Sequence, residues 1–314
     1  MSILITGGAG FIGSHIAHRL VSEGEEVVLA DIFTSQVYPA ELKRRRVQAL
    51  VPEMTIHNID ICNAEEVAEF ISKIQPSVII HLAAHASVTD SVLFPREYME
   101  TNSIGTLNIV RAATRTGSKV VLASSSTIYE DVHHAVSEHE PAHPLSPYGL
   151  SKQSAEQVAR LWHDLYGVST AILRLFSVYG PWGRPDMAPQ LFTEAILHSR
   201  RCAVTVGAGR DYVYIDDVVE AFLAVAMKTS NWEVLNIGSG VVTPLTSLVE
   251  TIGRSLHKIP EITMSVGRPG EMKTTAANIT AANEHLGWEP TWPLKAGIDQ
   301  LVSWYVTAMQ KQRF

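Results

Sequence analysis

Short apolar runs alternate with longer segments of helical periodicity through the first half of the chain. The runs that predict strands are Ile3–Thr6, Glu26–Ala30, Met54–His57, Val78–Leu82, Val120–Ala123 and Thr170–Leu175. Between them, apolar residues recur every three or four positions, which predicts helices over 11–22, 64–74 and 98–116. Repeated strand–helix units of this length indicate an α/β fold, with a parallel sheet covered on both faces by helices.

The second half of the chain has a different pattern. After Leu175 the elements become shorter and are separated by turn signals, among them Gly180–Pro185 and Gly207–Gly209. No flexible linker divides the halves, so we expect one compact unit. Residues 1–175 would form mainly a cofactor-binding domain and residues 176–314 mainly a smaller C-terminal lobe, with some elements interleaved. The cleft between them is the expected ligand site.

A glycine-rich turn joins the first strand to the first helix. Gly7 permits a tight turn, Gly10 lets the backbone approach a pyrophosphate, and Gly13 allows the helix to pack closely on the strand. The helix that opens at Phe11 and Ile12 offers free N–H groups and the positive end of its dipole to phosphates. This context predicts a Rossmann-type, doubly wound sheet that binds a dinucleotide.

An acidic residue ends the second strand about 20 residues later. Asp31 stands where the dinucleotide pattern expects a carboxylate for the adenosine ribose, and it would repel a 2′-phosphate. NAD is therefore favoured over NADP as cofactor; the alternative is that Asp31 is only a turn residue. Asp60 and Ile61 follow the third strand, where the acid could contact the adenine amine, although aspartate is also common in turns.

Tyr148 and Lys152 form the predicted catalytic pair. Ser146 and Pro147 predict the start of a helix, so the pair, four residues apart, shares one helix face. A phenol with a pKa of about 10 is a poor base at neutral pH. A neighbouring ammonium and the positive nicotinamide ring of NAD would stabilise the phenolate. Tyr148 could then remove a hydroxyl proton while hydride leaves the same carbon for NAD.

The chain resembles the extended short-chain dehydrogenases/reductases of the nucleotide-sugar epimerase/dehydratase group. The segments that carry the resemblance are GGAGFIG at 7–13, HLAAHASV at 81–88, TNSIGTLNIV at 101–110, SSST at 124–127, YGLSK at 148–152, LRLFSVYGPWGRPDM at 174–187, RDYVYIDDVV at 210–219, NIGSG at 236–240, RPGE at 268–271 and LGWEP at 286–290. The resemblance runs essentially from end to end. It implies a nucleotide-sugar substrate.

The resemblance also implies roles for individual residues. Ser125 joins Tyr148 and Lys152 as the third catalytic residue. The implied cofactor-site residues are Leu82, Ala83, Ala84 and Asn102, the last in cofactor or core support. The implied substrate-binding residues are Ser124, Ser125, Ser126, Ser177, Arg184, Arg210, Arg268 and Glu271. The two arginines at 210 and 268 would bind the pyrophosphate and the glutamate the ribose, unless Arg210 forms a surface ion pair with Asp211.

One segment departs from the family pattern. The 4,6-dehydratases of the family carry an acidic pair where this chain has Ser126 and Thr127. Glu130 instead stands where the family usually has glycine. It could serve as base for the C5 proton or as acid for the C6 hydroxyl of a hexose, or it could begin a solvated lid with Asp131. The histidines that follow, at 133, 134, 139 and 143, are expected to line a polar lid and to bind no metal.

These features leave three functions open. Glu130 favours a 5,6-dehydratase, and a narrower resemblance, to the hexosamine 5,6-dehydratases of tunicamycin biosynthesis, implies UDP-N-acetylglucosamine as substrate. The alternative is a UDP-sugar 4-epimerase acting on a UDP-hexose or UDP-uronate, because GPWGRPDM at 180–187 is typical of the uronate branch. A minor alternative is a non-catalytic NAD-sensing protein.

Composition and charge limit the classes of partner that the protein is expected to bind. The 314 residues are 46% hydrophobic and 18% charged, with a net charge of −7, which argues against nucleic acid. The basic run Lys43–Arg46 is expected to face solvent, or else to help hold an anionic ligand. Two distant cysteines and no membrane-length apolar run indicate a cytoplasmic protein that does not enter a membrane. The family resemblance implies a homodimer through helices around 98–116 and 151–166.

Overall fold

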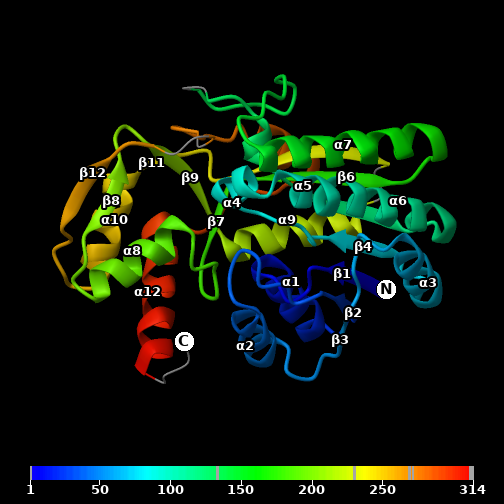
Figure 1. The fold of residues 1–314 in the computed structure, drawn as a ribbon, viewed down its shortest axis with the longest axis horizontal. Helices are drawn as coiled ribbons and strands as arrows, with labels where there is room; N and C mark the ends of the chain where they lie inside the picture. Colours follow the sequence, from blue (N-terminus) through cyan, green and yellow to red (C-terminus); the bar gives the residue numbers. More distant parts are fainter. Residues whose placement is uncertain (1, 132–133, 229–230, 268–269, 271, 311–314) are drawn as a thin grey trace.

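A seven-stranded parallel sheet forms the centre of the molecule (Figure 1). The computed structural model describes residues 2–131, 134–228, 231–267, 270 and 272–310. The strand order is β10-β6-β5-β4-β1-β2-β3, which is a Rossmann-type arrangement. The strands are β1 (Ser2–Thr6), β2 (Glu26–Ala30), β3 (Ile56–His57), β4 (Val78–His81), β5 (Lys119–Ser125), β6 (Thr170–Leu175) and β10 (Trp232–Ile237). The predicted α/β fold class is confirmed.

Helices cover both faces of this sheet. One layer contains α1 (Phe11–Ser22), α2 (Ala40–Leu50) and α9 (Ile215–Met227), and the other contains α3 (Ala64–Ile74), α6 (Gly105–Thr116) and α7 (Pro147–Tyr166). Side chains of β1 alternate between the two layers: Ile3 and Ile5 belong to one buried cluster and Leu4 to the other. This alternation explains why the strand reads as a continuous apolar run, because both of its faces are buried.

The helix predicted over residues 98–116 is divided into three parts. After α4 (Val88–Leu93), the chain forms α5 (Pro95–Met99), a π-helical turn over Glu100–Ile104, and then α6. A π-turn inserts an extra residue into the helical repeat and is frequent at functional sites. Here it carries Asn102 inward, where the side chain is buried.

The C-terminal lobe packs at the carboxyl ends of the strands of the large sheet, at the left of Figure 1. It contains a three-stranded sheet of β7 (Ser177–Tyr179), β9 (Gly209–Tyr214) and β11 (Val242–Pro244), and a two-stranded sheet of β8 (Cys202–Thr205) and β12 (Ile262–Ser265). Its helices are α8 (Ala188–Leu197), α10 (Leu245–Ser255) and α12 (Leu294–Gln310), whereas α11 (Thr280–Leu286) packs on β10 and α9. Since β10 and α9 lie with the large sheet, the chain crosses between the two parts more than once. The division at residue 175 stays a prediction.

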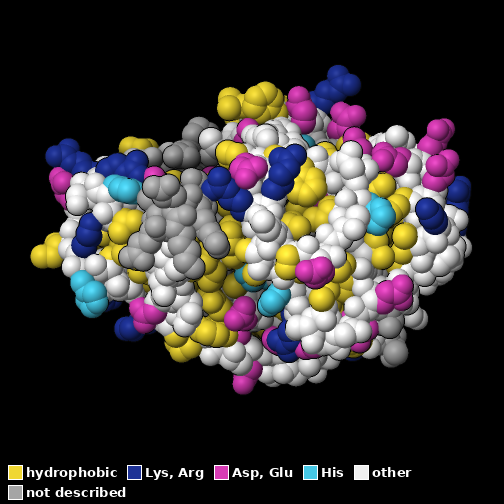
Figure 2. Space-filling view, turned by 90° about the horizontal axis from the view of Figure 1, so that it is seen from below, with side chains coloured by type: hydrophobic (Ala, Val, Ile, Leu, Met, Phe, Trp, Pro, Cys, Tyr) yellow, Lys and Arg dark blue, Asp and Glu magenta, His cyan; other side chains and the backbone are white. Residues whose placement is uncertain are grey.

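The basic run on α2 does not face solvent as a whole. Lys43 and Arg46 are buried, whereas Arg44 is exposed and Arg45 half-buried, so the expected solvated face is wrong for two of the four residues. The cause is helical periodicity, which turns positions three apart to the same side. On the face shown in Figure 2, Lys/Arg and Asp/Glu side chains are interspersed. Among the described helices, none has the length and apolar character needed to cross a membrane.

Candidate active site

The glycine-rich turn between β1 and α1 (residues 7–13, here called the cradle) has no room for side chains on its inner side. Gly7 has a left-handed φ of +72°, and a Cβ there would lie 2.7 Å from the Ala83 nitrogen. A Cβ on Gly13 would lie 2.4 Å from the Gly7 carbonyl oxygen. The helix therefore begins directly against the strand end, with its first N–H groups free at the mouth of the turn. This geometry fits a dinucleotide diphosphate.

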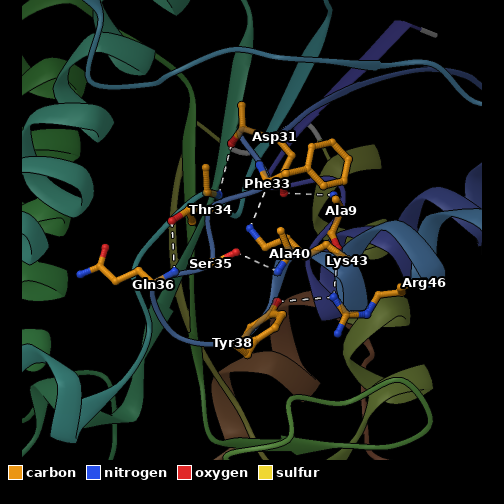
Figure 3. Close-up of polar contacts among 12 residues, drawn as sticks. Ala9, Asp31, Phe33, Thr34, Ser35, Gln36, Tyr38, Ala40, Lys43 and Arg46 are labelled. Atoms are coloured by element: carbon orange, nitrogen blue, oxygen red, sulfur yellow. Dashed lines mark hydrogen bonds and ion pairs between the residues drawn. The ribbon is translucent and has the colours of Figure 1, made fainter. Parts of the chain in front are cut away.

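Asp31 ties the cradle to the end of β2 (Figure 3). Its carboxylate accepts hydrogen bonds from the Ala9 N–H at 3.2 Å and the Phe33 N–H at 2.7 Å. Lys43 on α2 donates to the same carboxylate at 3.1 Å. The sequence predicted Asp31 as the ribose ligand but did not predict its buried lysine partner. The ribose role stays a prediction.

The residues after β3 and β4 form the sides of the predicted cofactor site. Asp60 accepts the Cys62 N–H at 2.9 Å, which is a turn interaction, and Ile61 is buried against Gly105. Adenine recognition by Asp60 stays a prediction. The loop Leu82, Ala83 and Ala84 follows β4, and the Leu82 N–H donates to the Thr6 carbonyl at 3.0 Å, beside the cradle.

Asn102 connects the loop after β4 to the catalytic helix. Its amide accepts the His85 N–H at 2.8 Å and donates to the His85 carbonyl at 2.9 Å. It also donates to the Ser151 hydroxyl at 2.8 Å, and Ser151 in turn donates to the Tyr148 carbonyl at 2.7 Å. Asn102 thus helps to hold the position of α7 relative to the loop after β4; its role at the cofactor stays a prediction.

The predicted catalytic residues converge where β5 ends and α7 begins. Ser146 caps α7 by accepting the Gly149 N–H at 3.1 Å, which sets the direction of the helix that carries Tyr148 and Lys152. Burial raises the pKa of Tyr148, whereas a hydrogen bond with Ser125 and the charge of Arg184 lower it. Burial lowers the pKa of Lys152 to about 8, against the opposing effect of a carboxylate one turn further along α7.

Thr127 holds the Ser125 hydroxyl so that it can donate a hydrogen bond, and no sequence pattern predicted this contact. Its N–H and its hydroxyl both donate to the Ser125 hydroxyl oxygen, at 3.2 and 2.9 Å. With both lone pairs of that oxygen engaged, the Ser125 proton is free to be donated to Tyr148 or to a sugar oxygen. This arrangement suits a residue that orients the reacting hydroxyl.

Arg184 lies near Tyr148, in the loop between β7 and α8. Its side chain is 16% exposed and is held by Asp186, with 3.0 Å between Nε and Oδ1. The resemblance predicted Arg184 as a substrate ligand, but its electrostatic effect on Tyr148 was missed. Ser177, also a predicted ligand, is half-buried at the start of β7, where it pairs with Tyr212 of β9.

A buried polar network underlies the serines of β5. The Ser124 hydroxyl donates to Glu156 of α7, and Glu156 forms an ion pair with Arg174 of β6 at 2.7 Å. Arg174 also donates to the Tyr129 hydroxyl at 2.8 Å. The sequence predicted Ser124 as a substrate ligand; in the structure its hydroxyl is engaged inside the protein.

A small pocket, too narrow to admit a water molecule, lies beside this network. It is lined by Ser126, Tyr129, Glu130, Val136, Phe176, Met272, Thr274, Thr275 and Ala276. Glu130 itself is exposed, and Asp131 accepts the N–H groups of Lys273 and Thr274 at 2.9 and 3.0 Å. Asp131 therefore anchors a neighbouring segment, which a solvated lid residue would not do.

The outer predicted ligands are only partly described. Arg210 donates to the carbonyls of Gly209 and Lys273 at 2.9 and 2.8 Å. Asp211 accepts hydrogen bonds from Ser239, Gly240 and Ala277, so its carboxylate is engaged there. Arg268, Glu271 and His133 lie outside the described residues. His134 is within 3.0 Å of Glu140, and His139 and His143 are exposed.

Comparison with known proteins agrees with this geometry. Residues 3–238 match the NAD dependent epimerase/dehydratase family. The chain belongs to that family. A UDP-glucuronate 4-epimerase of Thermodesulfobacterium geofontis is 33% identical over 315 residues, which cover 96% of this chain and 95% of that protein.

Two solved structures have closely similar folds. The UDP-glucuronic acid 4-epimerase of Bacillus cereus, in complex with UDP-glucuronic acid and NAD, is 31% identical with a TM-score of 0.91, covering 98% of this chain and 99% of that chain. The UDP-glucose 4-epimerase of Thermotoga maritima, with UDP-glucose, is 32% identical with a TM-score of 0.91, covering 98% and 100%.

As a member of this family the protein uses NAD, which when bound accepts and returns a hydride from the sugar. The cradle and Asp31 have the chemistry to hold the diphosphate and the ribose. Tyr148, Lys152 and Ser125 have the chemistry to move and hold a hydroxyl proton, and their catalytic roles stay a prediction.

Proposed function

We propose that this protein is a UDP-sugar 4-epimerase whose preferred substrate is a UDP-uronate such as UDP-glucuronate. The observation that carries the proposal is the guanidinium of Arg184, largely covered and close enough to Tyr148 to lower the pKa of its phenol. Tyr148 would deprotonate the C4 hydroxyl, and the carboxylate of a uronate is attached to the adjacent carbon, C5. Arginine binds carboxylates in a planar, two-pronged geometry. Asp186 already occupies the Nε and Nη2 side of Arg184 in this way, at 3.0 and 2.5 Å, so the substrate carboxylate would bind on the side of Nη1.

The chain's own residues supply the proton chemistry. Ser125 would donate to the C4 oxygen with its free hydroxyl hydrogen, and Tyr148 would take the C4 hydroxyl proton. The Lys152 ammonium would favour the phenolate form of Tyr148. After the keto sugar has turned in the site, Tyr148 would return the proton to the C4 oxygen. Epimerisation needs no further acid or base.

The comparisons support this alternative better than the 5,6-dehydration that Glu130 suggested from the sequence. The T. geofontis and B. cereus relatives are both named as epimerases of UDP-glucuronate. Dehydration expels a C6 hydroxyl, which a uronate lacks. The second candidate is a hexose 5,6-dehydratase acting on UDP-N-acetylglucosamine. The observation that favours it is that Glu130 lines the pocket with Ser126.

Product analysis distinguishes the candidates. The purified protein is incubated with UDP-glucuronate, UDP-glucose and UDP-N-acetylglucosamine separately, in deuterium oxide, and the products are examined by mass spectrometry and NMR. We expect an isobaric C4 epimer, formed fastest from UDP-glucuronate and without deuterium at C5. Loss of water together with loss of the C5 hydrogen, leaving a double bond between C5 and C6, would support the dehydratase, and loss of carbon dioxide would exclude both.

Replacing Arg184 tests the substrate. Arg184→Met should lower kcat/KM for UDP-glucuronate by roughly 10- to 150-fold more than for UDP-glucose, because a hydrogen bond to a charged group contributes about 1.5–3 kcal/mol. The ratio between substrates removes the effect of Arg184 on Tyr148, which both substrates share. Arg200→Met is the control, since Arg200 is an exposed arginine paired with Glu194. An unchanged ratio would show that Arg184 does not recognise the carboxylate.

We also propose a homodimer that forms through α7 and its neighbours. The exposed apolar side chains there are Ile104, Leu150, Leu161, Leu165 and Tyr166. The leucines are spaced so that they lie near one face of α7. Light scattering should give twice the chain mass of 34.4 kDa; a monomer at micromolar concentration would refute the dimer.

A further inference from the structure

Arg46 joins the cradle to the loop that carries Arg184. Its side chain on α2 is fully buried, and Nη1 donates to the Ala9 carbonyl at 2.9 Å (Figure 3). Nε and Nη2 both donate to the Trp182 carbonyl, at 3.1 and 2.8 Å. One guanidinium thus holds two segments that are 173 positions apart in the chain, counting from residue 9 to residue 182.

On the cradle side, the contact fixes the buried peptide of Ala9, which lies within the glycine-rich turn that would hold the diphosphate. The Ala9 N–H is held by Asp31 at 3.2 Å and its carbonyl by Arg46. Asp31 in turn accepts from Lys43, one turn earlier on the same helix. Helix α2 therefore supplies both of the cations that fix the cradle, one through Asp31 and one directly.

On the substrate side, the contact fixes an unusual backbone conformation. Trp182 has a φ of +62°, a left-handed conformation that is uncommon for any residue other than glycine. Its ring packs on Trp304 with 5.1 Å between centroids, and its carbonyl receives the two-pronged bond from Arg46. Arg184 follows two residues later. The position of Arg184 near Tyr148 thus depends on a turn that Arg46 holds.

The charge of Arg46 is not balanced by the described part of the protein. Its hydrogen-bond partners there are neutral oxygens, those of Ala9, Trp182 and, at 3.4 Å, the Tyr38 hydroxyl. The buried carboxylate that contacts the cradle, Asp31, is paired with Lys43. A buried charge without a counter-charge is unfavourable. The diphosphate of NAD, bound at the cradle, would bring the missing negative charge.

We infer that Arg46 is a positioning residue with two roles. It provides positive charge for the NAD diphosphate, and it couples binding of the cofactor to the conformation of the loop of residues 180–185. Binding of the diphosphate stabilises the charged guanidinium in its buried position. The guanidinium in turn holds the turn at Trp182, and this turn fixes the position of Arg184. The first part depends on the NAD dependence of the family. The second part rests on the proposed function, because it assumes that Arg184 binds substrate.

The first test uses ADP-ribose, which has the diphosphate of NAD but no nicotinamide ring. Its dissociation constant is measured by calorimetry on nucleotide-free protein at about 50 and about 300 mM salt. Arg46→Met should weaken binding roughly tenfold and flatten the salt dependence, while Arg46→Lys should restore most of the affinity. Arg45→Met, an equal charge change at a half-buried neighbour paired with Glu41, should have no effect. Unchanged affinity in Arg46→Met would overturn the inference.

The second test measures coupling between the two sites. ADP-ribose cannot touch the sugar through a nicotinamide ring, so any effect on UDP-glucuronate affinity reports on the protein. We expect it to tighten UDP-glucuronate binding about fivefold or more in the wild type and not in Arg46→Met. No coupling in the wild type would overturn the second part even if the variant did not fold. If UDP-glucuronate did not bind at all, the proposed function and with it the second part would fail, while the ADP-ribose titration would still decide the first part.

Discussion

Removing one partner of the buried Glu156–Arg174 ion pair should lower the free energy of unfolding by about 3 kcal/mol. Glu156 and Arg174 side chains are only 8% and 11% exposed. They make two contacts, 3.0 Å between Nε and Oε1 and 2.7 Å between Nη2 and Oε2. The same carboxylate accepts the Ser124 hydroxyl, so the pair also supports the strand end that carries Ser125.

The expected size follows from what each substitution leaves behind. Glu156→Met leaves a buried guanidinium without a negative partner, a loss of about 3–5 kcal/mol in free energy of unfolding. Arg174 keeps its bonds to the Tyr129 hydroxyl and the Glu138 carbonyl, at 2.8 and 3.0 Å, which places the loss near 3 kcal/mol. Arg174→Met should cost a similar amount. The double variant should lose clearly less free energy of unfolding than the two single variants added together, because neither charge is then left buried without a partner.

Urea unfolding of the four proteins of this cycle gives the coupling energy. Asp164→Asn is the control: it breaks the Arg160–Asp164 pair on the same helix, whose side chains are 51% and 48% exposed, and should change stability by less than about 0.5 kcal/mol. Strict additivity of the two single variants would refute the reasoning, as would a Glu156 effect no larger than that of the control.

The same variants separate stability from catalysis. Burial lowers the pKa of Lys152 to about 8, and the Glu156 carboxylate acts to raise it. Without Glu156 the ammonium is lost at a lower pH, so the basic limb of the kcat–pH profile should move to lower pH. Arg174→Met removes a positive charge and should not move that limb downward. A limb that shifted equally in both variants would show that Glu156 does not act on Lys152.

Three further predictions concern single side chains. Burial lowers the pKa of His81 to about 3, so this group alone should remove about 1.4 kcal/mol of stability per pH unit as pH falls below about 6.5, and His81→Gln should flatten the slope of Tm against pH. Asn102→Leu should cost about 2–3 kcal/mol in urea unfolding and lower kcat, since it strands the buried hydrogen-bonding groups of His85. Gly13→Ala places a Cβ 2.4 Å from the Gly7 carbonyl oxygen and should weaken ADP-ribose binding measured by calorimetry; unchanged affinity would show that the turn adapts.

Local patterns predicted the parts of the molecule whose cause is local. The strands β2 and β6 begin and end where the apolar runs do, because each is a run buried on both faces. The glycine spacing of the cradle reflects close backbone approaches within a few residues. Tyr148 and Lys152 could be paired from the sequence because a capped helix fixes the relation of residues four apart.

The features that the sequence did not predict depend on partners distant in the chain. The run Lys43–Arg46 does not indicate which side of α2 faces the cradle. The sequence pattern therefore predicted surface charges at two positions where the cations are buried. The effect of Arg184 on Tyr148 requires the Trp182 turn, and that turn is held from α2. The sequence did not predict the π-turn that carries Asn102 either, because the spacing of apolar residues there resembles that of one continuous helix.

A carboxylate near a sugar pocket is weak evidence for proton transfer unless something tunes it. Carboxylates that act as bases are adjusted by burial or by a paired charge. Glu130 is exposed, while its neighbour Asp131 binds the N–H groups of Lys273 and Thr274, so this acidic stretch has a structural use. Glu156 is buried, yet it is committed to Arg174. The covered groups still facing the reacting carbon would be Ser125, Tyr148 and an arginine, a set that suits reversible oxidation of a uronate and provides no base for C5.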